Sequence, residues 1–365
     1  MDGPRSIEPV EAALWESWQG TQRVHCFLCA HHCRIDVGDL GLCGVRKNIV
    51  GTLYTLVYGC PVSTGVDPIE KKPLFHFLPG SLSYSVATVG CNFSCLFCQN
   101  ADISQMPRDT GRVVGRPLSP QDLVEAALEQ GCLSISFTYT EPTIFYEYAR
   151  DCARLATAEG LKNVFVTNGY MTAQMLLDID GDLHAANVDL KSFSDEFYRK
   201  MAGARLKPVL DSIRRMWEMG VWLEVTTLLI PGHNDSPEEL RQLSAFLVSV
   251  SPDIPWHVSR FHPTYRLLDT PPTPVDAVEQ AIRIGREEGI RFVYGGNIPG
   301  HSSESTVCPH CGETVLERQG FSLRRNATRQ GRCPRCSELI PGHVSLAGPA
   351  AEGRTGEYHH PRKEG

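Results

Sequence analysis

The feature that most restricts the fold of this chain is a regular alternation of short apolar runs with helical patterns between about residues 82 and 297. The runs are rich in β-branched and aromatic residues, as strands are, and each gap between them can hold a helix. Strands that alternate with helices pair in parallel, because each helix returns the chain to the same edge of the sheet. The candidate strands are residues 83–90, 133–140, 163–169, 187–192, 222–230, 256–261 and 291–296. They predict an α/β barrel or partial barrel.

Three of the intervening helices begin with the same local signal, a hydroxyl residue followed by proline. The hydroxyl can accept a hydrogen bond from a free amide of the first turn, and proline suits the first helical position. The pairs are Ser119-Pro120, Ser236-Pro237 and Thr273-Pro274. We expect all three hydroxyls to cap helices.

Two cysteine-rich segments flank the alternating region and lack its rhythm. We predict that both are small modules held together by metal, because such short segments cannot bury a sufficient core. The tail is rich in Gly, Pro and charge, which predicts disorder. The expected divisions are an N-terminal cysteine-rich segment at 1–81, the barrel at 82–300, a module resembling a zinc ribbon at 301–343 and a disordered tail at 344–365.

The fourteen cysteines carry most of the chemical information in the sequence. No apolar stretch approaches the length of about 18 residues that a membrane span needs, and the first residues lack the regions of a signal peptide. We therefore expect a cytoplasmic protein with no membrane contact, in which thiols stay reduced and Cys-x2-Cys pairs indicate metal sites. The net charge of −7 gives no general attraction to nucleic acid, and we expect none as a partner.

Cys91, Cys95 and Cys98 form a Cys-x3-Cys-x2-Cys loop directly after the first barrel strand. Reactive groups gather in the loops at the carboxyl ends of such strands. Clusters of the [4Fe-4S] type normally use four thiolates, so three cysteines leave one iron open to a small molecule. The alternative is a zinc site completed by a distant residue, although structural zinc more often takes two pairs of ligands and closes all four positions.

The sequence resembles the radical S-adenosylmethionine (SAM) enzymes, and within them the radical SAM proteins of the AmmeMemoRadiSam system, which are relatives of pyruvate formate-lyase activating enzymes. The resemblance extends from about residue 23 to residue 343. The segments that carry it are CFLCAHHCRIDVGDLGLCGVRKN, VDPIEKKPLFHFLPGS, CNFSCLFCQN, FTYTEPT, VTNG, DLKSF, CPHC and CPRC. It implies a partial (β/α)6 TIM-like barrel that binds a [4Fe-4S] cluster at Cys91, Cys95 and Cys98.

The resemblance also implies an activity: the reduced cluster cleaves SAM to a 5′-deoxyadenosyl radical, which abstracts hydrogen from a substrate. Phe97 would lie beside the adenine, and Glu141 would hold the methionyl amino group. The ribose and the methionyl carboxylate would contact Asn168, Asp189 and Lys191. The plainer alternatives are core packing for Phe97 and a surface ion pair for Asp189 with Lys191.

Two histidines follow later candidate strands and could approach the cofactor or the substrate. His233 follows the fifth strand and His262 the sixth, and we take His262 as a candidate cofactor contact. Isolated histidines are more often satisfied polar residues than functional ones.

Two further sets of four cysteines lie on either side of the barrel. The first, Cys-x2-Cys-x3-Cys-x9-Cys, suits either zinc or a second iron–sulfur cluster, and its spacing cannot choose the metal. The second, Cys-x2-Cys-x21-Cys-x2-Cys, has the spacing of a zinc ribbon, in which zinc supplies folding free energy. The first set is Cys26, Cys29, Cys33 and Cys43, and the second is Cys308, Cys311, Cys333 and Cys336.

Three functions are compatible with these features. The first is hydrogen abstraction within the AmmeMemoRadiSam system, with an electron donor such as flavodoxin or ferredoxin and with Memo-like and AMMECR-like partner proteins. The second is activation of a glycyl-radical enzyme, in which the substrate is a glycine of a large protein. The third is a metal-stapled module that binds RNA or protein and has no redox catalysis.

Overall fold

The computed structural model of the protein describes residues 8–298 and 302–345, and its centre is one eight-stranded sheet. The strands follow one another across the sheet in chain order, and all pairs are parallel except β7 with β8. They are β7 (Ser63–Pro68), β8 (Leu82–Ala87), β9 (Ser134–Phe137), β10 (Lys162–Thr167), β11 (Ala185–Asp189), β12 (Trp222–Leu229), β13 (Trp256–Arg260) and β14 (Val293–Gly296). Within the described residues β7 and β14 are the two edges and do not pair, so the barrel is partial.

The seven candidate strands are confirmed as β8 to β14, one parallel strand more than a (β/α)6 barrel has. The eighth strand, β7, lies in the lead-in segment and was not predicted. It contains Gly65 and ends at Pro68, residues that suit an edge strand rather than a central one.

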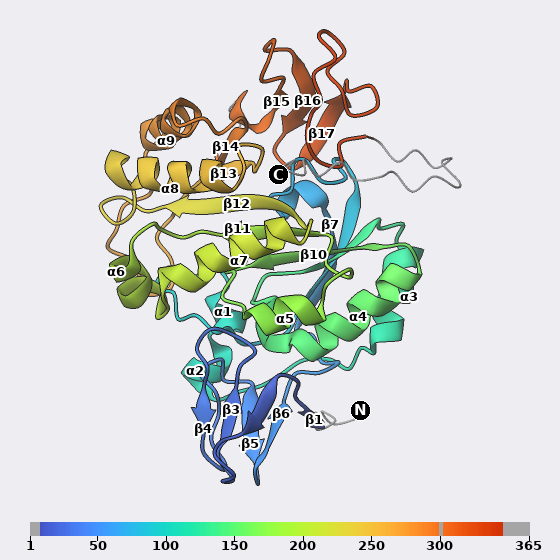
Figure 1. Ribbon diagram of the computed structural model, residues 1–365, viewed down its shortest axis with the longest axis vertical. Helices are drawn as coiled ribbons and strands as arrows, with labels where there is room; N and C mark the ends of the chain where they lie inside the picture. The colour runs from blue at the N-terminus through green and yellow to red at the C-terminus, as the bar shows by residue number, and fades with distance from the viewer. Residues whose placement is uncertain (1–7, 299–301, 346–365) are drawn as a thin grey trace, which may run out of the picture.

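The helices cover the outer face of the curved sheet (Figure 1). For example, α4 packs on β10, α7 on β12, and α9 on β13 and β14. Their bounds are α1 (Ala101–Ser104), α2 (Met106–Thr110), α3 (Pro120–Glu129), α4 (Tyr146–Ala158), α5 (Ala173–Asp178), α6 (Asp195–Phe197), α7 (Leu206–Glu218), α8 (Pro237–Val250) and α9 (Val275–Glu287), with short turns η1 (Ile69–Lys71), η2 (Pro142–Phe145), η3 (Tyr198–Ala202) and η4 (Ser302–Glu304). No helix in the described ranges is long and apolar enough to cross a bilayer.

Two of the three predicted helix caps are confirmed. The Ser119 hydroxyl accepts a hydrogen bond from the amide of Asp122, and the Ser236 hydroxyl accepts one from Glu239. The prediction for Thr273 is wrong, because α9 begins two residues later and its cap position is Pro274. The buried Thr273 hydroxyl instead bonds Leu229 and Phe261, where it joins two strand ends.

The N-terminal segment forms two three-stranded antiparallel sheets at one end of the barrel (Figure 1). One sheet contains β1 (Val10–Glu11), β6 (Thr52–Thr55) and β5 (Arg46–Ile49), and the other contains β2 (Trp15–Ser17), β3 (Val24–Cys26) and β4 (Arg34–Ile35). Arg46 joins this module to the barrel: it lies 2.9 Å from Glu147 of α4, and both side chains are buried.

The C-terminal module lies at the opposite end of the barrel and contains β15 (Thr306–Val307), β16 (Thr314–Gln319) and β17 (Ser322–Asn326) (Figure 1). It docks on the segment between β7 and β8. The amide of His343 donates to the carbonyl of His76 (2.7 Å), whose ring bonds Pro341 and Tyr294. The predicted disordered tail lies outside the described residues from position 346 on.

Removing one partner of the buried pair between Arg46 and Glu147 is expected to destabilise the whole chain. The Glu147→Gln variant leaves the Arg46 guanidinium buried without its counter-charge, which costs about 3–5 kcal/mol. Chemical denaturation followed by circular dichroism measures the loss. The exposed pair of Arg23 with Asp36 provides the control, since Asp36→Asn should leave stability unchanged. An equal stability of Glu147→Gln and the unchanged chain would contradict the role given to Arg46.

The junction with the C-terminal module is expected to weaken in mild acid. Burial lowers the pKa of His76 to about 4, and burial also lowers the pKa of His343 to about 4. Both rings stay neutral in the folded chain, while the unfolded chain binds protons below its ordinary histidine pKa of about 6.5. The free energy of unfolding should therefore fall as the pH drops from about 7.5 to about 5. A His76→Gln variant should show a smaller fall, and an unchanged slope in that variant would contradict the assignment.

Candidate functional site

A cavity of about 770 Å³ opens at the carboxyl ends of the strands. Its walls include the residues that follow β9, β10 and β11 and the ends of β12, β13 and β14. Parallel strands bring these ends together although they are far apart in the sequence. Nine residues were predicted at the cluster and the cofactor. Seven of them lie in the loop after β8 or at the ends of β10 and β11. All nine except His262 line this cavity. Those that do are Cys91, Cys95, Phe97, Cys98, Glu141, Asn168, Asp189 and Lys191.

The loop after β8 carries the three central cysteines. Its backbone is fixed by bonds to η3, from Ser94 to Ala202 (2.9 Å) and from Leu96 to Met201 (3.0 Å). A side chain at Gly203 would be strained, because φ is 69° and an added Cβ would lie 2.3 Å from the present position of the Ser94 hydroxyl. Backbone contacts with η3 therefore hold the loop on one side, and its three cysteines line the cavity.

Two of the three sulfurs have hydrogen-bonding groups close to them. Cys91 Sγ accepts a bond from the Phe93 amide (3.3 Å), and the Asn168 side chain lies 3.8 Å from the same sulfur. Cys98 Sγ lies 3.1 Å from the Ser104 hydroxyl. Donors of this kind stabilise thiolates and tune the potential of a cluster bound to them.

Burial makes the thiols of Cys91 and Cys95 poor acids in the absence of a metal. It raises the pKa of Cys95 to about 12, although the charge of Lys191 opposes it. Burial also raises the pKa of Cys91, and the charges of Glu141 and Cys95 add to the effect. A bound cation would offset this cost, since ionised groups in apolar surroundings need a compensating charge.

Glu141 is almost fully buried and holds the cavity wall together. One carboxylate oxygen accepts bonds from the amide and hydroxyl of Thr143 and from the hydroxyl of Thr167, and the other accepts one from the Asn168 amide. The side chain thus ties the loop after β9 to the end of β10. One lone pair or more on its second oxygen remains available to a ligand.

The Asp189 carboxylate and the Lys191 ammonium lie 3.0 Å apart at the end of β11. Both line the cavity, so the pair is not an ordinary surface pair, and Lys191 has only 15% of its side chain exposed. Burial lowers the pKa of Lys191, but the charges of Asp189 and Cys95 outweigh this effect and raise it. The Lys191 ammonium also lies 5.8 Å from the ring of Phe97, which itself is buried against Phe197.

His262 is exposed and is not among the residues that line the cavity, and His233 is exposed as well. His257 of β13 lines it instead, and its ring nitrogen lies 2.7 Å from the buried Glu224 carboxylate. His257 was not predicted, because only histidines that follow a strand were considered and His257 lies within β13. The unused signal is the alternation along β13, which puts its second residue, His257, on the same side as Ser259, and both line the cavity.

Two lysines of the lead-in segment also line the cavity and were left without a role from the sequence. The ammonium groups of Lys71 and Lys72 lie 2.7 and 2.6 Å from the same carboxylate, that of Asp67. The hydroxyl of Tyr139 bonds that carboxylate too. Two cations against one anion leave a local excess of positive charge in this wall.

The C-terminal module supplies a further part of the wall. Gly320 and Phe321, at the turn between β16 and β17, line the cavity. Arg318 holds this turn down: its guanidinium lies 3.6 Å from Glu70 and 4.3 Å from the centre of the Phe75 ring. The C-terminal module therefore forms part of the cavity wall.

The four cysteines of the C-terminal module form a compact group. Their sulfurs all lie within 4.8 Å of one another, with 3.5 Å between Cys308 and Cys336 and 3.6 Å between Cys311 and Cys333. Four thiolates around one zinc ion, each at about 2.3 Å, require spacings of this size. This group could hold a metal ion.

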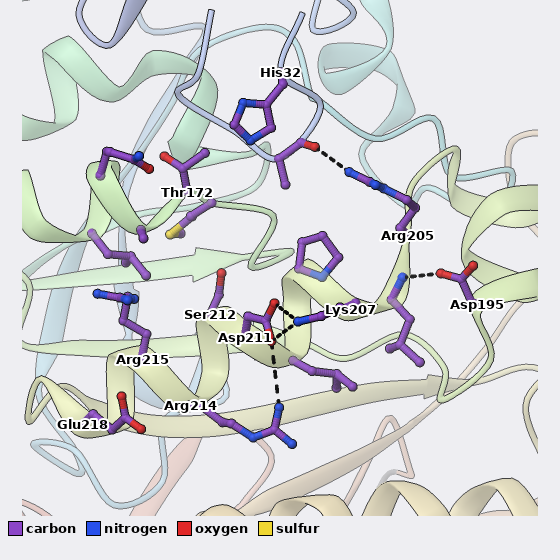
Figure 2. Close-up of a pocket in the computed structure, with 18 of the residues that line it drawn as sticks. His32, Thr172, Asp195, Arg205, Lys207, Asp211, Ser212, Arg214, Arg215 and Glu218 are labelled. Carbon is purple, nitrogen blue, oxygen red and sulfur yellow. Dashed lines mark hydrogen bonds and ion pairs between the residues drawn. The ribbon is translucent and has the colours of Figure 1, made fainter.

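A larger groove of about 1060 Å³ lies outside the barrel, between α5, α7 and the N-terminal module. Arg205 spans it with a bond to the carbonyl of Ala30, and Lys207 and Arg214 are paired with Asp211 (Figure 2). None of the residues predicted at the cluster or the cofactor lines it. The barrel cavity is therefore the candidate active site.

Comparisons with known proteins agree with this geometry. The sequence pattern of the radical SAM superfamily matches residues 85–244. An uncharacterized protein of Methanocaldococcus jannaschii, MJ0808, is 43% identical over 333 residues, which are 90% of this chain and 98% of that protein. A putative glycyl-radical enzyme activating enzyme of the same organism is 25% identical over 48% of this chain and 66% of its own length.

Two more distant similarities cover about half or more of the chain. A GTP 3′,8-cyclase of Haemophilus influenzae is 25% identical over 51% of this chain and 52% of its own length. The crystal structure of Streptococcus suis SuiB with S-adenosylmethionine aligns with a TM-score of 0.48 at 14% identity, over 68% of this chain and 60% of that chain. On the family match and the full-length relative, this chain is an enzyme that belongs to the radical SAM superfamily.

Proposed function

We propose that this enzyme abstracts a hydrogen atom from a substrate bound in the barrel cavity, as a radical SAM enzyme of the AmmeMemoRadiSam system. One observation carries the proposal: three thiols from a single loop share a cavity with the polar residues at the ends of β9, β10 and β11. A cluster bound by three thiols keeps one iron open, and the surrounding polar groups suit a zwitterionic cofactor.

The residues present fit the cluster and SAM. The thiols of Cys91, Cys95 and Cys98 face one cavity, and two of them have donors within reach of their sulfurs. The side-chain nitrogen of Asn92, in the same loop, is buried and has no hydrogen-bond partner among the described residues, while its oxygen accepts a bond from Asn168. A buried donor without a partner in this loop is consistent with an acceptor supplied by a bound group.

A cluster held by Cys91, Cys95 and Cys98 would supply the electron for reductive cleavage of SAM, and that chemistry would allow hydrogen abstraction from a substrate in the cavity. The chain's own residues position the reactants. Glu141 offers a carboxylate to the methionyl ammonium, and Lys191 offers an ammonium to the methionyl carboxylate. The Phe97 ring, buried at the cavity wall, gives the adenine an apolar surface.

The cavity also limits what can react. Its volume of about 770 Å³ lies within the range of roughly 300–1,000 Å³ that is typical of small-molecule sites. It can therefore take the cofactor together with one small part of a substrate. The turn at Gly320 and Phe321 forms part of the wall around this space.

The partners are part of the proposal. A low-potential donor such as flavodoxin or ferredoxin would reduce the cluster, and Memo-like and AMMECR-like proteins would act with the enzyme, the substrate itself being a protein in one version of this scheme. None of the fourteen cysteines, all of which the structure describes, is in a disulfide, which suits the reducing conditions of the cytoplasm, where we place the enzyme. Membership of an enzyme superfamily favours this activity over a non-catalytic RNA- or protein-binding module.

A second candidate is activation of a glycyl-radical enzyme. Its support is the similarity to a putative activating enzyme over about half of this chain. Co-expression with a glycyl-radical enzyme, followed by electron paramagnetic resonance, would detect a glycine radical on the partner if this candidate is right.

Loss of one central cysteine is expected to abolish SAM cleavage. The Cys95→Ala variant should make no 5′-deoxyadenosine from SAM and dithionite under anaerobic conditions, because two thiols cannot hold the cluster. Chromatography with mass detection measures the product, and circular dichroism checks that the barrel still folds. Cys132→Ala, at a buried cysteine outside all three sets, is the matched control. Full cleavage by Cys95→Ala would refute the cluster assignment.

The C-terminal group is proposed to hold structural zinc. The chain should carry about one zinc per molecule at this site, and Cys333→Ser should lose it and unfold the module, which becomes sensitive to limited proteolysis. The exposed His310 lies between the first two cysteines, and His310→Ala should keep the metal. Zinc content by plasma emission decides the matter, and unchanged zinc in Cys333→Ser would contradict this site.

A further inference from the structure

The four N-terminal cysteines converge although they come from separate turns. Cys26 ends β3, and its amide donates to the carbonyl of Cys33 (2.9 Å). The sulfur of Cys33 lies beside Gly41, 3.9 Å from where a Cβ would stand, and thereby reaches the turn that carries Cys43. Between Cys26 and Cys33, the carbonyl of Cys29 accepts a bond from the amide of His32 (3.1 Å), so Cys29 lies in the short connection that joins β3 to β4. The four cysteines therefore lie in two adjoining turns.

Their spacing differs from that of the C-terminal group. In the part of the chain that the structure describes, only the C-terminal set has three or more ligand atoms that all lie within 4.8 Å of one another. The N-terminal thiols are therefore spread more widely than the thiolates around a single zinc ion, as are those of Cys91, Cys95 and Cys98. A cube of four irons requires the wider spacing, because each thiolate binds a different iron.

The N-terminal set lies directly against the catalytic loop. A Cβ at Gly90, the residue before Cys91, would stand 3.1 Å from the carbonyl oxygen of Cys43 and 2.8 Å from Val45. Only glycine allows this approach, and Gly90 also has a positive φ of 103°. The two cysteine loops thus touch through their backbones.

Two side chains bridge the same contact. His31, within the N-terminal cysteine motif, lies 2.8 Å from the carbonyl of Asn92, which follows Cys91. Arg108 of α2 donates to the carbonyl of Leu42, which precedes Cys43, and to that of Phe93. These contacts place the N-terminal cysteine loop directly beside the loop of Cys91, which is the arrangement that electron transfer between two centres requires.

We propose that Cys26, Cys29, Cys33 and Cys43 bind a second [4Fe-4S] cluster, which passes one electron at a time to the catalytic cluster across the contact at Gly90. In this relay, a reduced ferredoxin-type protein would give one electron to the second cluster and would itself be oxidised. The second cluster would then pass that electron to the catalytic cluster and return to its oxidised state. The metal assignment stands on the geometry of the N-terminal set, and the relay rests on the proposed function.

Metal analysis of anaerobically reconstituted full-length chains tests the assignment. The unchanged chain should bind about eight irons, and the triple variant Cys91→Ala, Cys95→Ala, Cys98→Ala should keep about four, with the absorption of an iron–sulfur cluster. The double variant Cys29→Ser, Cys33→Ser should also keep about four, and Cys60→Ala, at a buried cysteine outside the three sets, should keep all eight. A triple variant that carries zinc and no iron would overturn the second cluster.

The two proposals fail in different ways. A chain that binds no iron at all removes the proposed function, whereas about four irons in the unchanged chain and none in the triple variant removes only the second cluster. The relay has its own readout. Dithionite is small enough to enter the cavity, so the double variant should still cleave SAM with dithionite but lose about tenfold or more of its rate with reduced ferredoxin. Equal losses with both reductants would overturn the relay.

Discussion

The parallel alignment of seven consecutive strands is the constraint on which the rest of the structure depends. Because each strand runs in the same direction as the next, the loops that follow them open on one side of the sheet. This is how a thiol loop after β8, a carboxylate after β9 and an ion pair at the end of β11 come to share one cavity. The chemistry of the site follows from where the strands end.

Both flanking modules contact the cavity or the loop after β8 that lines it. Glu224, buried in β12, accepts bonds from the amides of Phe75 and His76 and from the rings of Trp222 and His257. The carboxylate thereby fixes the lead-in segment on which the C-terminal module docks. That module then places the turn at Phe321 in the cavity wall, while the N-terminal module contacts the catalytic loop at Gly90.

Much of this architecture was predictable from local sequence. The seven barrel strands, two of three helix caps and the spacing of all three cysteine sets follow from patterns within a few residues. The two errors concern side chains whose positions depend on how distant elements pack together. Thr273 has the sequence pattern of a helix cap, but its hydroxyl donates to the carbonyl of Leu229 in β12 and accepts a bond from the amide of Phe261, the residue after β13. His262 follows the end of β13 but is exposed and does not line the site, while His257 lies within that strand and lines it.

The sequence by itself determined the parallel α/β class, the three cysteines in one loop after a strand, and the two flanking sets of four cysteines. These are properties of neighbouring residues, whose spacing along the chain already constrains their geometry. Only the tertiary structure decided which lysines and which histidine line the cavity, that the C-terminal turn forms part of its wall, and that the backbone at Cys43 lies against Gly90. Contacts between residues so distant in sequence depend on how the elements pack, and packing is a property of the whole chain.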